Sequence, residues 1–136
     1  MRYSYNCIFE DKRIPIMAYT IETVLAEKFQ TIMSGGLNTR LKYFNDIYVL
    51  MNLKVRDIDN KILVSAINNT FKKRETLLDI NEFNMIIEEL ENDRNIKRQW
   101  IEYQDKNSHA KDIKYEYTIT AIKQIINILK SETVKG

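Results

Sequence analysis

Cysteine and histidine each occur only once in the 136 residues, as Cys7 and His109. A single cysteine cannot form an intrachain disulfide, which fits a reducing compartment such as the cytosol. One cysteine and one histidine also cannot supply the ligand set of a zinc site. No Ser-His-Asp or Cys-His arrangement is convincing either. We therefore expect neither a metal site nor a nucleophilic triad in this sequence.

Long apolar runs and an excess of one charge are absent too. No stretch approaches the roughly 20 apolar residues of a membrane helix, and the first residues, MRYSYNCIFEDKR, lack the apolar segment of a signal peptide. The formal net charge is +2, which disfavours tight nucleic-acid binding through charge alone. With 44% hydrophobic residues, the sequence predicts one folded domain over residues 1–136 that is soluble and cytoplasmic, without membrane contact.

Hydrophobic periodicity predicts a mainly α fold with a short N-terminal β-hairpin. Residues 1–18 alternate at period two, which is typical of paired strands. From Thr20 the period changes to that of a helix and continues to about residue 134. The pattern predicts a bundle of five to six helices, over about residues 20–34, 39–51, 57–73, 81–91 and 115–131, with a further helix that carries Ile96, Trp100, Ile101 and Tyr103. Within the third helix we expect Ile62, Ala66, Ile67 and Phe71 to face inward.

Glycine is scarce, and two of the three glycines are the neighbours Gly35 and Gly36. A phosphate-binding loop places several backbone N–H groups at a helix N-terminus. The pair carries neither a G-x-x-x-x-G-K nor a G-x-G-x-x-G pattern, so we favour a helix stop. Asp57 and Asp59 form an Asp-x-Asp pair, which can hold metal ions when it lies on a strand. Here the pair opens a predicted helix, so we favour capping.

Lys28 lies on the apolar stripe of the first predicted helix. Two interpretations are open. The methylene chain of Lys28 packs against apolar residues while its ammonium reaches solvent, or the ammonium pairs with a phosphate or a carboxylate. The second is considered because an unpaired buried charge is costly. On the second helix, Lys42 and Asp46 are an i,i+4 pair. Asp46 is the best candidate partner for Lys28, ahead of Glu22 and Glu27. Arg40 is predicted to fall toward the apolar side of that helix.

These stretches resemble the nucleotidyltransferase AbiEii/AbiGii toxin family of abortive-infection and toxin–antitoxin systems. The resemblance rests on YTIE (19–22), AEK (26–28) and RLKYFND (40–46), with a weaker match in NTFKKRET (69–76). It implies the C-terminal helical half of such an enzyme, without the half that carries the metal-binding Asp-x-Asp. Such a chain is expected to be inactive alone. Mg²⁺ and a nucleoside triphosphate are expected only with a complete catalytic half.

The resemblance also implies roles for single residues. Lys28 and Asp46 take the catalytic positions, with Lys28 reaching the phosphates of the nucleotide. Arg40, Lys42 and Arg74 are implied phosphate-binding residues. Tyr43 stands where the family has an aspartate, which is a departure within the catalytic motif.

The expected partners are an antitoxin or the missing N-terminal half, and a tRNA acceptor. A homodimer through the hairpin, using its alternating residues Tyr3, Tyr5, Cys7 and Phe9, is a further expectation. The alternative function is a helical protein-interaction or regulatory domain in a phage-defence system.

Overall fold

Four of the six described α-helices begin where a short polar side chain accepts hydrogen bonds from free backbone N–H groups. Thr20 accepts a hydrogen bond from the N–H of Thr23 at 3.2 Å. Asp59, Asp79 and Asp93 cap three later helices in the same way. The capping role predicted for Asp59 is therefore confirmed.

The computed structural model describes residues 20–53 and 57–135, and within them the fold is helical. The helices are α1 (Ile21–Gly35), α2 (Leu41–Leu53), α3 (Asn60–Lys73), α4 (Ile80–Asn92), α5 (Arg94–Lys106) and α6 (Tyr115–Lys135). Two 3₁₀ turns, η2 (Gly36–Asn38) and η4 (Ser108–Ala110), join neighbouring helices. The predicted hairpin over residues 1–18 lies outside the described residues.

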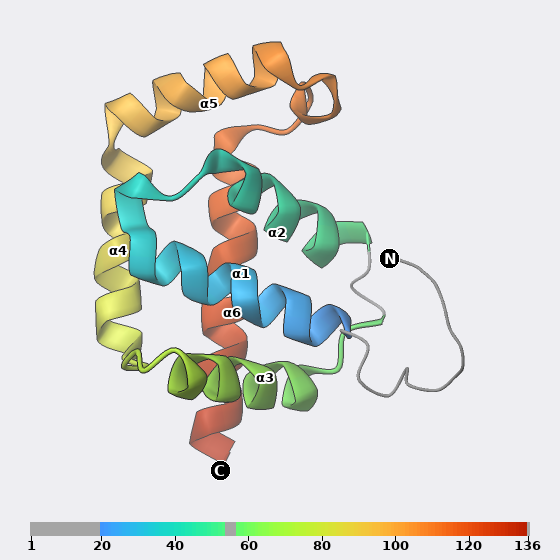
Figure 1. The fold of residues 1–136 in the computed structure, drawn as a ribbon, viewed down its shortest axis with the longest axis vertical. Coiled ribbons are helices and arrows are strands. Elements are labelled where there is room, and N and C mark those ends of the chain that lie inside the picture. The colour runs from blue at the N-terminus through green and yellow to red at the C-terminus, as the bar shows by residue number, and fades with distance from the viewer. Residues whose placement is uncertain (1–19, 54–56, 136) are drawn as a thin grey trace.

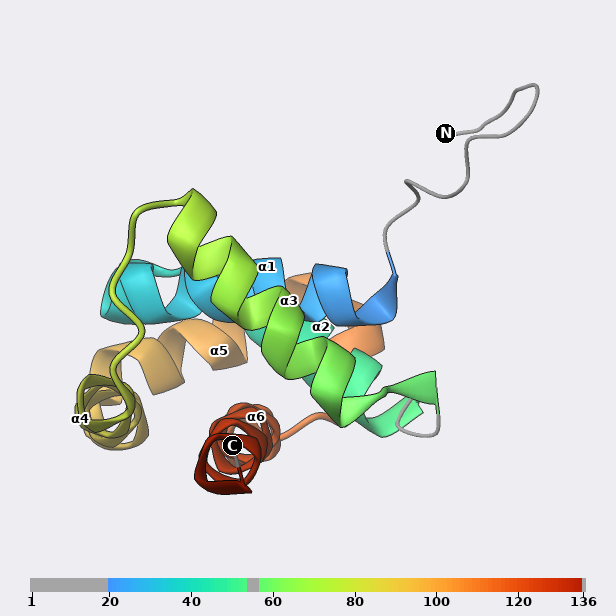
Figure 2. The ribbon, with the colours of Figure 1, turned by 90° about the horizontal axis from the view of Figure 1, so that it is seen from below.

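The helices form two layers. In Figure 1, α1 lies in front with α2 above it and α3 below it, and all three cross α6. Figure 2 shows α4 and α6 nearly end-on in the second layer, on the other side of the molecule from α1. The two run in opposite directions, and α5 closes one end of the bundle. This arrangement leaves one long side of α1 facing outward between α2 and α3.

The core is apolar and aromatic. Phe29, Phe71 and Phe83 meet at ring-centroid distances of 5.3 to 6.1 Å and join α1, α3 and α4. The inner face of α6 is buried, and its apolar residues recur at helical spacing: Ile119, Ile122, Ile125, Ile126 and Leu129. Burying such side chains stabilises a fold by roughly 1.5–3 kcal/mol each.

Buried polar groups in the core find partners on the backbone. The indole of Trp100 donates to the carbonyl of Ile113 at 2.9 Å. The hydroxyl of Tyr115 donates to the carbonyl of Leu90 at 2.8 Å. The first bond joins α5 to the segment that precedes α6, and the second joins the start of α6 to the C-terminal part of α4.

Among the expectations about single positions, one is wrong and others are confirmed. Ile62, predicted to face inward, is 51% exposed at the start of α3. It sits on the outer side of the helix, because Leu63 next to it takes the buried position of the first turn. The inward positions predicted for Ile67 and Phe71 are confirmed. Gly36 ends α1 with φ +55°, so the helix stop predicted for the glycine pair is confirmed.

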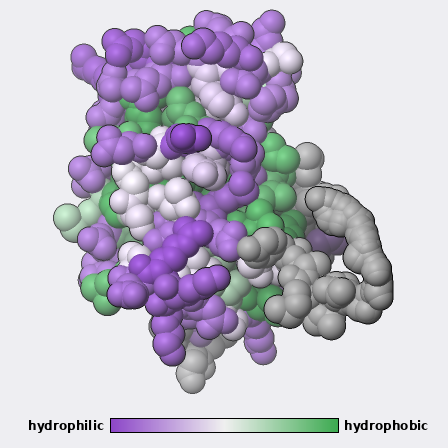
Figure 3. All heavy atoms as spheres, viewed as in Figure 1, coloured by the Kyte–Doolittle hydropathy of each residue, from purple (hydrophilic) through white to green (hydrophobic). Residues whose placement is uncertain are grey.

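The molecular surface in this view is mainly hydrophilic. Figure 3 shows hydrophilic residues over most of the bundle, with hydrophobic surface between the helices and beside the C-terminal end of α2. Among the helices of residues 20–53 and 57–135, none combines the length and apolar character that a bilayer span requires.

Candidate functional site

The centre of the candidate site is an ion pair between α1 and α2. The ammonium of Lys28 donates to Oδ2 of Asp46 at 2.8 Å, and their side chains are 20% and 25% exposed. The pairing predicted for Lys28 is therefore confirmed, with the partner that was ranked first. The pair is held because α1 and α2 pack together, which brings residues 18 positions apart into contact.

An aromatic ring lies beside the same ammonium. Nζ of Lys28 is 5.2 Å from the ring centroid of Tyr43, within the range of a cation–π contact. The face of an aromatic ring attracts a cation but carries no net charge. Tyr43 therefore leaves the ammonium with one carboxylate partner, whereas an aspartate at this position would add a second negative charge.

Two further rings lie near the ion pair: Tyr103, near the end of α5, and His109, in the connection between α5 and α6. Burial and then the nearby carboxylate of Asp46 raise the pKa of the Tyr103 phenol. His109, in η4, packs edge-on against Tyr103 with the ring centroids 6.2 Å apart. The phenol of Tyr103 thus stays a hydrogen-bond donor at neutral pH within the field of Asp46.

Three hollows adjoin one another along the outward side of α1. The largest of these three, of about 660 Å³, is lined by Val24, Lys28, Asn45, Asp46, Val49, Leu50 and His109. A hollow of about 150 Å³ shares Val24 and Lys28 with it. That hollow in turn shares Glu27 and Arg74 with a groove of about 400 Å³ between α1 and α3. The shared residues place the three hollows next to one another along α1. We refer to these three hollows together as the depression along α1, and the Lys28–Asp46 pair lies in the largest of them.

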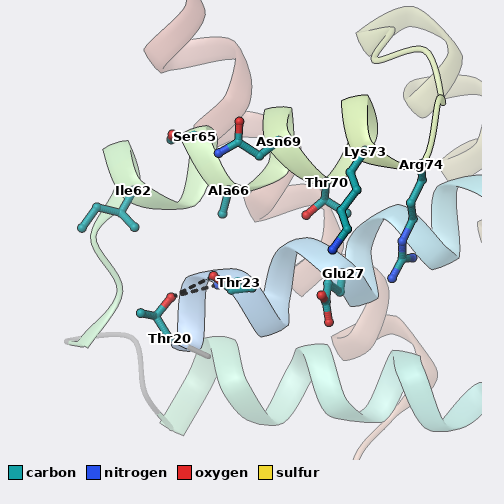
Figure 4. Close-up of a pocket in the computed structure, with 10 residues that line it drawn as sticks. All are labelled: Thr20, Thr23, Glu27, Ile62, Ser65, Ala66, Asn69, Thr70, Lys73 and Arg74. Atoms are coloured by element: carbon teal, nitrogen blue, oxygen red, sulfur yellow. Dashed lines mark hydrogen bonds between the residues drawn. The ribbon is translucent and has the colours of Figure 1, made fainter. Parts of the chain in front are cut away.

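The groove between α1 and α3 is lined mostly by polar side chains. Thr20, Thr23, Ser65 and Asn69 supply hydroxyl and amide groups along it. Figure 4 shows Lys73 and Arg74 extending from α3 toward α1, with Lys73 pointing toward Glu27. This end of the depression therefore offers two cations and one carboxylate to a bound molecule.

Arg74 also fastens α3 to α1. Its guanidinium donates to Oε1 of Gln30 at 2.5 Å and to the hydroxyl of Thr31 at 3.2 Å. The same Gln30, which is only 4% exposed, donates to Thr76 at 3.0 Å. The C-terminal end of α3 is thus held against the middle of α1, and Arg74 keeps part of its exposed fork for other contacts.

The remaining predicted phosphate-binding residues, Arg40 and Lys42, lie on the surface outside the hollows. Arg40 was predicted to fall toward the apolar side of the second helix, and this is wrong. Arg40 is exposed and precedes α2, because the helix begins only at Leu41. Lys42 is exposed on the first turn of α2. Neither residue lines the hollows described above.

The described residues do not fit a divalent metal. Within residues 20–53 and 57–135, no group of three Asp, Glu, His or Cys side chains is placed to hold an ion. The carboxylate of Asp59 is used as a cap, accepting from the N–H groups of Lys61 and Ile62 at 2.9 and 3.1 Å. No chemical step through a metal is therefore derived from these residues.

The sequence analysis did not assign Asn45 and Tyr103 to the site, although the position of Asn45 could have been recognised from the sequence. Asn45 is 5% exposed and lines the 660 Å³ hollow. It lies four residues from both Leu41 and Val49, so the argument that singled out Lys28 also applies to it. Tyr103 carried no such signal, because only the packing of α5 brings it near Asp46.

Comparison with known proteins identifies the family. The family model described as "Nucleotidyl transferase AbiEii toxin, Type IV TA system" matches residues 1–123. The chain belongs to the AbiEii nucleotidyl transferase toxin family. No curated protein and no solved structure matches the chain. The ion pair and the hollows along α1 thus lie in the part of the chain that the family model matches.

Proposed function

We propose that this chain is the nucleotide-contacting helical module of an AbiEii-type nucleotidyltransferase toxin. The observation that supports the proposal best is the half-buried Lys28–Asp46 pair in the depression along α1. A lysine held this way is preorganised, because its position is fixed before a ligand arrives. Its ammonium can exchange part of its contact with Asp46 for a contact with a phosphate.

In this proposal the other cations assist the same ligand. Arg74 and Lys73 line the adjoining hollows and offer donors to an acceptor strand or to further phosphates. Arg40 and Lys42 are exposed near the start of α2, where they would attract a polyanion at longer range. The expected acceptor is a tRNA, and the expected partners are a type IV antitoxin and a catalytic half that holds Mg²⁺.

Under this proposal, the chain alone does not catalyse nucleotidyl transfer. Phosphoryl and nucleotidyl transfer normally require cations on the triphosphate. The described residues offer Lys28 without a metal-binding carboxylate cluster. The first test incubates the pure chain with labelled nucleoside triphosphates, Mg²⁺ and total tRNA. No label should enter the RNA unless a protein carrying the metal-binding Asp-x-Asp is added.

The second test measures nucleotide binding by calorimetry. The wild-type chain should bind a nucleoside triphosphate, and Lys28→Met should weaken that binding about tenfold, or about 1.4 kcal/mol. Lys97→Met, at an exposed position of α5, is the matched control and should bind as the wild type does. Equal binding by all three proteins would contradict a nucleotide role for Lys28. Binding by none of them would favour the alternative of a protein-interaction domain.

A further inference from the structure

Asn45 is a buried polar residue whose side-chain oxygen has no hydrogen-bond partner. Its Oδ1 is the one buried side-chain nitrogen or oxygen within residues 20–53 and 57–135 that lacks a hydrogen bond. Leaving such a group unpaired costs roughly 1–3 kcal/mol. Because the great majority of buried polar groups are paired, an exception calls for a physical explanation.

The surroundings of Asn45 supply that explanation. The residue lines the 660 Å³ hollow together with Lys28 and Asp46. The other lining residues from the two helices, Val24 on α1 and Val49 and Leu50 on α2, are apolar. The volume lies in the range of small-molecule sites, which combine apolar walls with a few polar groups that fix orientation.

We propose that this hollow receives the base of the nucleotide and that Asn45 hydrogen-bonds the edge of that base. A nucleobase has apolar faces, which suit Val24, Val49 and Leu50, and an edge of donors and acceptors. An asparagine amide carries one acceptor and two donors and pairs with such edges side by side. The inference rests on the proposed function, since Lys28 in the same hollow contacts the phosphates.

This assignment makes Asn45 a binding residue kept at some cost in stability. Replacing it with leucine, which has a similar size, removes the unpaired amide and keeps the volume filled. A residue with a purely structural role would lower stability when replaced. Asn45→Leu should instead leave the melting temperature unchanged or raise it, because a buried unpaired group is removed.

The experiment compares two probes by calorimetry: a nucleoside triphosphate and inorganic tripolyphosphate, which has no base. Asn45→Leu should weaken binding of the nucleoside triphosphate about tenfold and leave tripolyphosphate binding unchanged. Lys28→Met should weaken both. Asn45→Ala is the second variant if the leucine variant does not fold, and the same pattern is expected of it.

The outcomes separate this inference from the proposed function. If the wild-type chain binds neither probe, the proposed function fails and this inference fails with it. If the wild-type chain binds both, but the Asn45 variants bind the nucleoside triphosphate equally well, only the base contact is overturned. Equal weakening of both probes by the Asn45 variants also overturns it, since Asn45 would then act through the phosphate site.

Discussion

Lys28 on α1 and Asp46 on α2 form a direct ion pair at 2.8 Å, with about a quarter of each side chain or less in contact with solvent. The exposure of this pair is intermediate between that of a surface ion pair and that of a fully buried one. Exposed pairs contribute about 0–1 kcal/mol, whereas breaking a buried pair costs about 3–5 kcal/mol. The pair therefore links the site to the stability of the α1–α2 contact.

A double-mutant cycle measures that link. Lys28→Met and Asp46→Asn should each lower the free energy of unfolding by about 1–2 kcal/mol, with a coupling energy near 1 kcal/mol. The control is the Lys123–Glu91 pair, whose side chains are 46% and 40% exposed. Its coupling should stay below about 0.5 kcal/mol. Urea unfolding provides the measurement, and equal couplings for the two pairs would contradict the expected effect of burial.

Arg74 should matter more for stability than its exposure suggests. Arg74→Met removes the donor to the buried amide of Gln30, so Oε1 of Gln30 loses a partner and unfolding becomes easier by about 1–2 kcal/mol. Lys73→Met, at the neighbouring exposed position, should change stability by less than about 0.5 kcal/mol. Thermal unfolding of both variants gives the comparison. A Lys73 effect as large as that of Arg74 would point to general charge rather than to this hydrogen bond.

The end of α3 contains a strained residue. Glu75 has φ +54°, while the N–H of Thr76 donates to the carbonyl of Phe71 at 2.8 Å, as in a Schellman motif. Glycine is the residue best suited to this conformation, so Glu75→Gly should stabilise the protein by about 1 kcal/mol. Glu75→Ala keeps the strain and should have little effect. A loss of stability in the glycine variant would show that the glutamate side chain has a role of its own.

Stability should fall in alkaline solution because of Tyr115. Burial, followed by the charges of Asp93, Glu91 and Glu116, raises the pKa of its phenol. The unfolded chain releases this proton at about pH 10, while the folded chain retains it. The unfolded state then binds fewer protons, so the contribution of Tyr115 is complete below about pH 10 and is lost progressively above it.

Tyr115→Phe tests this titration. The variant should lose about 1 kcal/mol near neutral pH, because the carbonyl of Leu90 loses its donor. Its unfolding free energy should then decline less steeply above about pH 10 than that of the wild type. Tyr117→Phe, at an exposed position of the same helix, should keep the wild-type slope. Identical slopes for all three proteins would contradict the assignment to Tyr115.

The helices were predictable from the sequence because their signals are local. The apolar stripe of α6 and the stop at Gly36 depend on spacing and on backbone conformation within one segment. The Lys28–Asp46 contact was also predictable, since a charge on an apolar stripe demands a partner and few carboxylates were available nearby.

Other features depended on the tertiary arrangement and had no local signal. Glu22 looked like a favourable charge in the first turn of α1. It is instead 5% exposed, and it accepts the N–H of Asp59 at 2.8 Å from a segment 37 residues away. Gln30 is buried for a similar reason, because Arg74 and Thr76 reach it only after α3 has packed. The exposure of Ile62 likewise depends on which side of α3 meets α1.

The central place of α6 has a consequence for synthesis of the protein. This helix packs against α2, α3 and α4, yet it is the last of the described helices to leave the ribosome. Until it arrives, the inner faces of the earlier helices remain uncovered. At about 5–20 residues per second, the ribosome needs about one to four seconds to make its 21 residues. During that interval the nascent chain is open to chaperones and to aggregation, and the Lys28 site lacks the support of a finished core.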